Sequence, residues 1–227
     1  MEAAPKEQPK EQARTQPELI VSIGPHVRAE ESTAKIMWTV TAALLPATLM
    51  AIYYFGIPAI LVIVVSILSA VICEAVMQKI LKKDVTVADG SAFLTGLLIA
   101  MNCPANIPLY IPAVASFVAI VITKQLFGGL GYNIFNPALI GRALILVSFA
   151  KPMTTFTKPV LNVLSLDAKT MATPLTVMKE DGVAKLLELY PNIYQNLLLG
   201  NRAGSLGETA TVALLLGAAF LLIKRYI

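Results

Sequence analysis

The sequence predicts an all-α polytopic membrane protein, and composition and hydropathy are the reasons. Of its 227 residues, 56% are hydrophobic and 14% are charged, whereas soluble domains average about 45–50% and about 25%. The mean hydropathy is +0.71, and several apolar runs approach the roughly 20 residues with which a helix crosses a bilayer. The net charge of +4 forms no basic patch interleaved with aromatic residues. We therefore expect contact with lipid and none with nucleic acid.

The first apolar block, residues 36–78, is long enough for two helices. Gly56 and Pro58 interrupt it, which predicts a hairpin with its turn at residues 55–58. The polar residues 1–34 before it lack the basic start and apolar core of a signal peptide. They are interpreted as a cytoplasmic tail.

The third apolar segment, VADGSAFLTGLLIAMNCPANIP, is interrupted. Asp89 can cap its helix, but Pro104 and Pro108 stop it after about four turns. A half-helix followed by extended chain is tolerated at membrane depth only where protein buries it.

Three more segments follow. Residues 109–127 form a span, GGLGYN is a glycine-rich loop, and residues 135–150 form a short span that opens with Asn-Pro-Ala. Five membrane segments are thus expected within residues 35–150. A mostly polar loop then covers residues 151–208, and the sixth segment covers residues 209–227.

The basic residues of the short connections predict the orientation, because Lys and Arg accumulate on the cytoplasmic side. With a cytoplasmic N-terminus, the inner side receives the residues that end segments two, four and six: Lys79, Lys82, Lys83, Lys124, Lys224 and Arg225. The loop over residues 151–208 then faces outward.

A broken third segment is typical of channel-like bundles built from two inverted repeats. Five spans plus one would be the first repeat and the opening of the second. We therefore expect a chain truncated after its sixth segment, as part of a longer protein.

Four stretches together point to one family: VSIGPHVRAEESTAKIMWTVTAALLPA, GGLGYNIFNPALIGRA, GSLGETATVALLLGAAFLL and LDAKTMATPLT. Over residues 21–227, with these stretches in the family's order along the chain, the sequence resembles the D subunit of the Rnf complex, which is related to the B subunit of the sodium-pumping NADH:quinone reductase. The resemblance implies a redox subunit of an ion-translocating ferredoxin:NAD⁺ oxidoreductase, a translocase of the prokaryotic cytoplasmic (inner) membrane. Other membrane and peripheral Rnf subunits would be its partners.

The stretch LDAKTMATPLT resembles the family's flavin-attachment motif, Asp-x-x-Ser/Thr-Gly-Ala-Thr. The match is Asp167, Thr170, Ala172 and Thr173, and it implies that a flavin transferase links FMN through its phosphate to Thr173. Met171 departs from the motif, in which a small residue is usual. By themselves, Asp and Thr in a loop are ordinary turn-formers.

The glycine-rich loop is a second candidate site. The related reductase subunit holds a non-covalent flavin in its membrane part. Asn133 and Asn136 are candidates to contact such a flavin (riboflavin or FMN) here, together with Gly131 and Arg142. Asn136 can instead cap the next helix, with Pro137 at its first position. Arg142 can equally snorkel or pair with a carboxylate.

The remaining polar residues predict less. Glu74, near the inner end of the second span, is expected to pair with Gln78 or a lysine rather than to bind an ion. No His, Cys or Asp cluster has metal-ligand spacing, so no metal is expected. The alternative function is a solute channel of the urea-channel or aquaporin kind, which the broken segment and Asn-Pro-Ala also suit. The choice between Na⁺ and H⁺ stays open.

Overall fold

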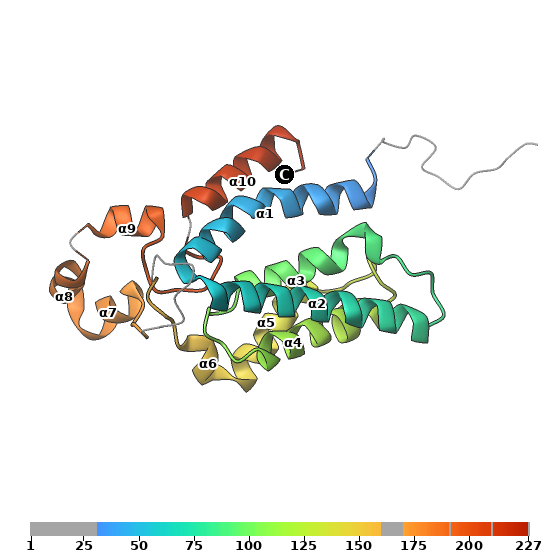
Figure 1. Ribbon diagram of the computed structural model, residues 1–227, viewed down its shortest axis with the longest axis horizontal. Helices are drawn as coiled ribbons and strands as arrows, with labels where there is room; N and C mark the ends of the chain where they lie inside the picture. Colours follow the sequence, from blue (N-terminus) through green and yellow to red (C-terminus); the bar gives the residue numbers. More distant parts are fainter. Residues whose placement is uncertain (1–30, 160–169, 191, 210, 227) are drawn as a thin grey trace, which may run out of the picture. The chain divides into compact units, whose positions relative to one another are not determined.

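The computed structural model describes residues 31–159, 170–190, 192–209 and 211–226, so most of the predicted N-terminal tail lies outside it. Within these ranges all the regular elements are helices, and the only β-structure is one isolated bridge between Thr157 and Thr170 (Figure 1). The all-α prediction is confirmed. The helices are α1 (Thr33–Phe55), α2 (Ile57–Ile80), the 3₁₀ turn η1 (Val87–Asp89), α3 (Ser91–Met101), α4 (Tyr110–Phe117), the π-helix η2 (Val118–Gln125), α5 (Pro137–Ser148), α6 (Ala150–Thr154), α7 (Pro174–Glu180), α8 (Gly182–Leu189), α9 (Ile193–Leu199) and α10 (Thr211–Ile223).

Helices α1 and α2 form the predicted hairpin. They have 23 and 24 residues and are apolar enough to cross a membrane. Gly56, with φ of 65°, ends α1 and begins α2. Few residues other than glycine adopt this backbone conformation, and Pro58 then suits the first turn of α2.

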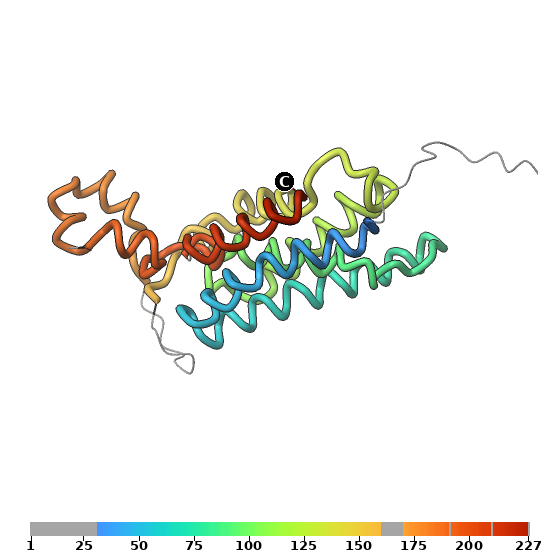
Figure 2. The backbone as a smooth tube through the Cα atoms, turned by 90° about the horizontal axis from the view of Figure 1, so that it is seen from above, coloured from blue at the N-terminus to red at the C-terminus, as the bar shows by residue number. Residues whose placement is uncertain are grey.

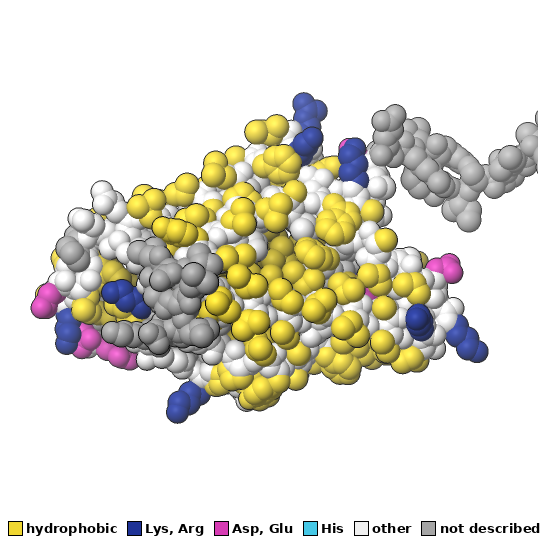
Figure 3. Space-filling model, in the orientation of Figure 1, with side chains coloured by type: hydrophobic (Ala, Val, Ile, Leu, Met, Phe, Trp, Pro, Cys, Tyr) yellow, Lys and Arg dark blue, Asp and Glu magenta, His cyan; other side chains and the backbone are white. Residues whose placement is uncertain are grey.

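The surface of α2 is patterned for lipid. Over residues 57–78 its exposed side chains recur every three or four residues and are apolar: Leu61, Val64, Leu68, Ile72 and Val76. Its buried side includes the polar residues Ser66, Glu74 and Gln78, the reverse of a helix that faces water. Figure 3 shows hydrophobic side chains over the helices on the face in view, with charged groups toward the ends. This arrangement supports a membrane protein.

The third segment is broken, as predicted, and it is shorter than predicted. Helix α3 has 11 residues, about three turns and roughly 16 Å of rise, against a hydrocarbon core of about 30 Å. The chain then runs without helix to α4, which continues directly into η2. Cys103 and Pro104 of this connection are fully buried. The first part of the break is therefore enclosed by protein, whereas Asn106, Pro108 and Leu109 are exposed.

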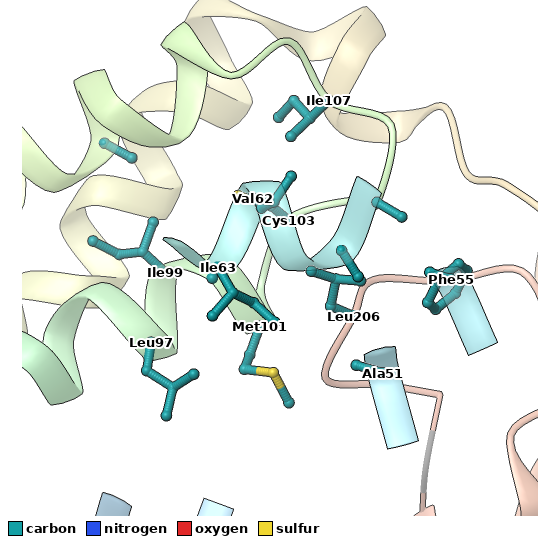
Figure 4. Close-up of a cluster of buried hydrophobic side chains, with 14 of the residues drawn as sticks. Ala51, Phe55, Val62, Ile63, Leu97, Ile99, Met101, Cys103, Ile107 and Leu206 are labelled. Carbon is teal, nitrogen blue, oxygen red and sulfur yellow. The ribbon is translucent and has the colours of Figure 1, made fainter. Parts of the chain in front are cut away.

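A distant segment pairs with the backbone at the end of α3. The amide of Leu206 donates to the carbonyl of Cys103 at 3.0 Å, and the amide of Gly207 donates to the carbonyl of Met101 at 2.7 Å. Figure 4 shows Leu206 among the buried side chains around Met101 and Cys103. A Cβ on Gly207 would lie 2.9 Å from the Met101 carbonyl oxygen, so only glycine allows this approach without a shift.

A buried polar contact joins α2, α3 and α4. The Ser66 hydroxyl donates to the Gly96 carbonyl at 2.8 Å, and the Ser116 hydroxyl donates to the Ser66 carbonyl at 3.0 Å. Both hydroxyls have a partner, as buried polar groups require. Helix α5 packs against α3 and α4, and α10 lies along α1 (Figures 1 and 2). These contacts build the helical group on which the candidate sites lie.

The predicted loop over residues 151–208 contains helices that the sequence interpretation did not include. Helices α7, α8 and α9 gather at the end of the helical group where α1 ends (Figures 1 and 2). They have a small hydrophobic cluster of their own, made of Val177, Leu186 and Tyr190 with Met171 and Ile193 packed against it. Met171, within the predicted flavin-attachment motif, thus packs on a folded element.

Candidate functional site

Thr173 lies at the start of α7, where its side chain caps the helix. The backbone is extended there, with φ of −66° and ψ of 154°, and Pro174 takes the first helical position. Thr173 Oγ1 accepts a hydrogen bond from the Thr176 amide at 3.3 Å and lies 2.8 Å from Thr176 Oγ1. The side chain is partly exposed. A cap bond of this kind fixes the hydroxyl and leaves it accessible.

Two other motif residues are exposed on the same segment. Thr170 pairs with Thr157 in the isolated bridge, and Ala172 precedes Thr173. The bridge holds the segment against residues 156–157, because the Met171 amide also donates to the Phe156 carbonyl at 3.0 Å. Asp167 lies outside the described residues.

Met171, the residue that departs from the motif, has a structural partner. The Tyr190 hydroxyl donates to its sulfur at 3.5 Å, and the side chain packs on the cluster of α7 and α8. Burial raises the pKa of the Tyr190 hydroxyl above its ordinary value. Met171 links the motif to the helices that follow it.

A cavity of about 480 Å³ adjoins Thr173. Its volume falls in the range of roughly 300–1,000 Å³ that is usual for small-molecule sites. Most of its walls are apolar, and its charged members are Arg202 and Glu208. The other residues lining it are Phe156, Pro174, Leu175, Met178, Leu186, Ile193, Leu197 and Ala203.

The two candidate asparagines line a common cavity of about 360 Å³. Asn136 Oδ1 accepts from the Ala138 amide at 3.0 Å, so this side chain caps α5 with Pro137 at its first position. Asn133 Oδ1 is buried and has no hydrogen-bond partner among the described residues. Lys124 lies on another wall of the same cavity.

Gly131 and Arg142, the other two candidates, do not line this cavity. Gly131 is exposed, with φ of 92°. Arg142 Nη1 donates to Asn102 Oδ1 at 2.9 Å, at the residue that ends α3. In the described part of the chain Arg142 thus has an amide partner and no carboxylate.

Sequence reasoning found Glu74 but missed the extent of its network. Glu74 Oε1 lies 2.6 Å from Lys124 Nζ, and their side chains are 1% and 2% exposed. The Gln125 and Gln78 amides donate to the same oxygen at 3.0 and 3.3 Å. Lys124 also donates to Ser91 at 2.6 Å. The expected pairing with Gln78 and a lysine is confirmed, although the pair is buried rather than interfacial.

The chain is similar to known proteins over most of its length. The model of the NQR2, RnfD, RnfE family matches residues 20–227. The chain belongs to this family.

Three curated members of the NQR2, RnfD, RnfE family are among its relatives. The D subunit of a proton-translocating ferredoxin:NAD(+) oxidoreductase complex from Clostridium ljungdahlii is 49% identical, covering 91% of this chain and 63% of the relative. The D subunit of a Na(+)-translocating ferredoxin:NAD(+) oxidoreductase complex from Acetobacterium woodii is 43% identical, covering 92% and 64%. The D subunit of an ion-translocating oxidoreductase complex from Rhodobacter capsulatus is 40% identical, covering 90% and 63%.

The chain therefore spans less than two thirds of the length of these relatives. The resemblance to the Rnf D subunit, first seen in four short stretches, is confirmed over most of the chain.

Proposed function

We propose that this chain is a membrane redox subunit that carries FMN as a phosphoester on Thr173. It passes electrons within an ion-translocating ferredoxin:NAD⁺ oxidoreductase complex. The observation that carries the proposal is the position of Thr173, a partly exposed hydroxyl beside a cavity, in a chain of the NQR2, RnfD, RnfE family whose relatives are named as subunits of such complexes.

Attachment requires a hydroxyl that a transferase can reach. The Thr173 oxygen forms the new bond to phosphorus, the bond from phosphorus to the leaving group of an activated flavin nucleotide breaks, and the hydroxyl proton leaves to solvent. The cap bond from the Thr176 amide orients this oxygen, and Pro174 fixes the backbone that follows. The attached flavin then supplies one- and two-electron chemistry, while the protein supplies its position.

A second, non-covalent flavin, riboflavin or FMN, fits the cavity beside the glycine-rich loop. Asn133 Oδ1 is a buried acceptor without a partner in the described residues, and such an atom costs about 1–3 kcal/mol unless a donor meets it. A flavin ring offers an N–H donor at its edge. Asn133 is the principal contact in this proposal, Asn136 lines the same space, and Gly131 and Arg142 take no part.

The proposed orientation rests on the basic residues that lie at one end of the helices. The Tyr226 hydroxyl donates to Glu31 at 2.6 Å, so the residues after α10 meet the start of α1. Lys83 donates to the Gly128 carbonyl at 3.0 Å, which joins the connections after α2 and η2. By the positive-inside rule this end is cytoplasmic. The N-terminus then lies in the cytoplasm of a prokaryote, and Thr173 lies on the outer side of the inner membrane.

The partners in this proposal are the other membrane and peripheral subunits of the complex, a flavin transferase and the bilayer. The coupling ion is left open, because the relatives at 49% and 43% identity are named for protons and for Na⁺ respectively.

Peptide mapping tests the proposal. Trypsin cleaves after Lys169 and Lys179, which releases residues 170–179 as one peptide. We expect this peptide, from the full chain produced with a flavin transferase, to carry the mass of FMN, and fragmentation to assign it to Thr173. An unmodified peptide, in a preparation where the transferase labels a known substrate, would contradict the proposal.

A further inference from the structure

Among the described residues, three buried side-chain atoms have no hydrogen-bond partner: Glu74 Oε2, Asn133 Oδ1 and Arg202 Nε. Each of the three residues lines a different cavity. The third cavity is the one beside Thr173. Arg202 therefore brings an unpaired cationic donor to the space next to the proposed attachment site.

The hydrogen bonds of Arg202 are to carbonyl groups of residues near it in the sequence. It lies two residues after Gly200, which ends α9 with φ of 98°, and its amide donates to the Gly200 carbonyl at 2.8 Å. Its Nη2 donates to the Glu208 carbonyl at 2.7 Å. No ion pair of Arg202 occurs in the part of the chain that the structure describes. The charge persists at any physiological pH. Among the described residues no carboxylate lies within ion-pair distance of it, although Glu208 lines the same cavity.

The rest of the cavity suits a flat apolar ring. Its apolar lining includes Phe156 from the segment before the motif and Met178 from α7. It also includes Leu186 from α8, and Ile193 and Leu197 from α9. Leu186 is also part of the cluster that holds these helices together. Apolar walls with a few placed polar groups are typical of cofactor sites.

We propose that this cavity seats the ring system of the flavin carried on Thr173, with the Arg202 guanidinium at its N1–C2=O edge. The inference rests on the proposed function. Two electrons and one proton, which binds at N5, convert the oxidised ring to its anionic reduced form, and the negative charge is spread over N1 and C2=O. A fixed guanidinium at that edge stabilises the reduced form and raises the reduction potential.

The test measures the potential of the tethered flavin in the full chain, produced with a flavin transferase and titrated with dithionite in detergent. Arg202→Gln removes the charge and keeps hydrogen-bonding groups, and Arg202→Lys keeps the charge. Lys185→Gln is the matched control, because Lys185 is exposed, pairs with Asp181 at 3.9 Å and does not line the cavity.

Arg202→Gln is expected to lower the ratio of reduced to oxidised flavin at a given potential at least tenfold, a shift of about 30 mV for a two-electron couple. Arg202→Lys is expected to retain most of the native potential, and Lys185→Gln all of it. Equal potentials for native protein and a labelled Arg202→Gln variant would overturn the inference.

The native protein gives a second measurement that needs no variant, in case Arg202→Gln is not labelled. A ring seated in the cavity is shielded from iodide, so iodide should quench its fluorescence several-fold more strongly after denaturation. Equal quenching in both states would overturn the inference. Failure of the proposed function looks different, because native protein would then show no covalent fluorescence at all.

Discussion

Lys124 Nζ lies 2.6 Å from Glu74 Oε1, although the two residues are 50 positions apart in the sequence. The pair joins the C-terminal part of α2 to the π-helix η2, and the Ser91 hydroxyl at the start of α3 accepts a hydrogen bond from the same ammonium group. Three of the helices that form the broken-segment arrangement therefore meet at one charged group. The network makes the position of α3 depend on both partners.

Neutralising one partner of this pair should destabilise the protein strongly. Glu74→Gln or Lys124→Met leaves a buried charge without its partner. Such a change typically lowers the free energy of unfolding by roughly 3–5 kcal/mol. The double variant removes both charges and should lose clearly less than the sum. Thermal unfolding in detergent measures this, and strictly additive losses would show that the two groups do not interact.

The pairing of Gly207 with the end of α3 predicts a specific glycine requirement. Gly207→Ala puts a methyl group 2.9 Å from the Met101 carbonyl oxygen. The backbone shift that this requires should lower the free energy of unfolding by about 1–3 kcal/mol. Gly204→Ala is the matched control, since its Cβ would meet nothing closer than 3.5 Å. Comparable melting temperatures for the two variants would contradict the role of Gly207.

In the contact between the end of α3 and residues 206–207, the sequence predicts one side better than the other. Pro104 and Pro108 are local signals that end a helix wherever they occur, so the broken segment could be predicted. The partner at Leu206 and Gly207 could not, because pairing between distant segments leaves no periodic trace in either one. GSLGET was identified only through the family resemblance.

The candidate sites likewise have features that the sequence predicts and features that it does not. The Asn136 cap was foreseen as one alternative, because an Asn-Pro pair before an apolar run is itself a helix-start signal. The burial of Lys124 was not, because a lysine after an apolar span normally marks the interface. Helices α7 to α9 have seven or eight residues each, and the cluster that stabilises them forms only when they fold together.

The proposal of a second flavin predicts different effects for substitutions at Asn133 and at Asn136. Asn133→Leu removes the unpaired acceptor, and we expect the non-covalent flavin to be lost while the label on Thr173 remains. Asn136→Ser keeps a capping oxygen, so α5 and the bound flavin should both be retained. Asn136→Ala removes the cap and should lower the free energy of unfolding by about 1 kcal/mol. Acid extraction and chromatography quantify the flavin, and an undiminished amount in Asn133→Leu would refute this site.

Topology can be tested with cysteines on a background in which Cys73 and Cys103 are replaced by serine. A cysteine at Lys179 should react with an impermeant maleimide in intact cells, because the segment that carries Thr173 is proposed to face outward. A cysteine at Lys79, in the last turn of α2, should react only after lysis. The opposite pattern would assign the flavin to the cytoplasmic face.

Covalent flavin fluorescence on a denaturing gel tests the central claim most directly, because a flavin that is merely bound is lost there. The variants Thr173→Ala, Thr173→Ser and Thr176→Ala are produced with a flavin transferase beside the native chain. We expect fluorescence from native protein and Thr176→Ala, none from Thr173→Ala, and recovery in Thr173→Ser, which keeps the hydroxyl. Fluorescence that persists undiminished in Thr173→Ala would contradict the assignment of FMN to this residue.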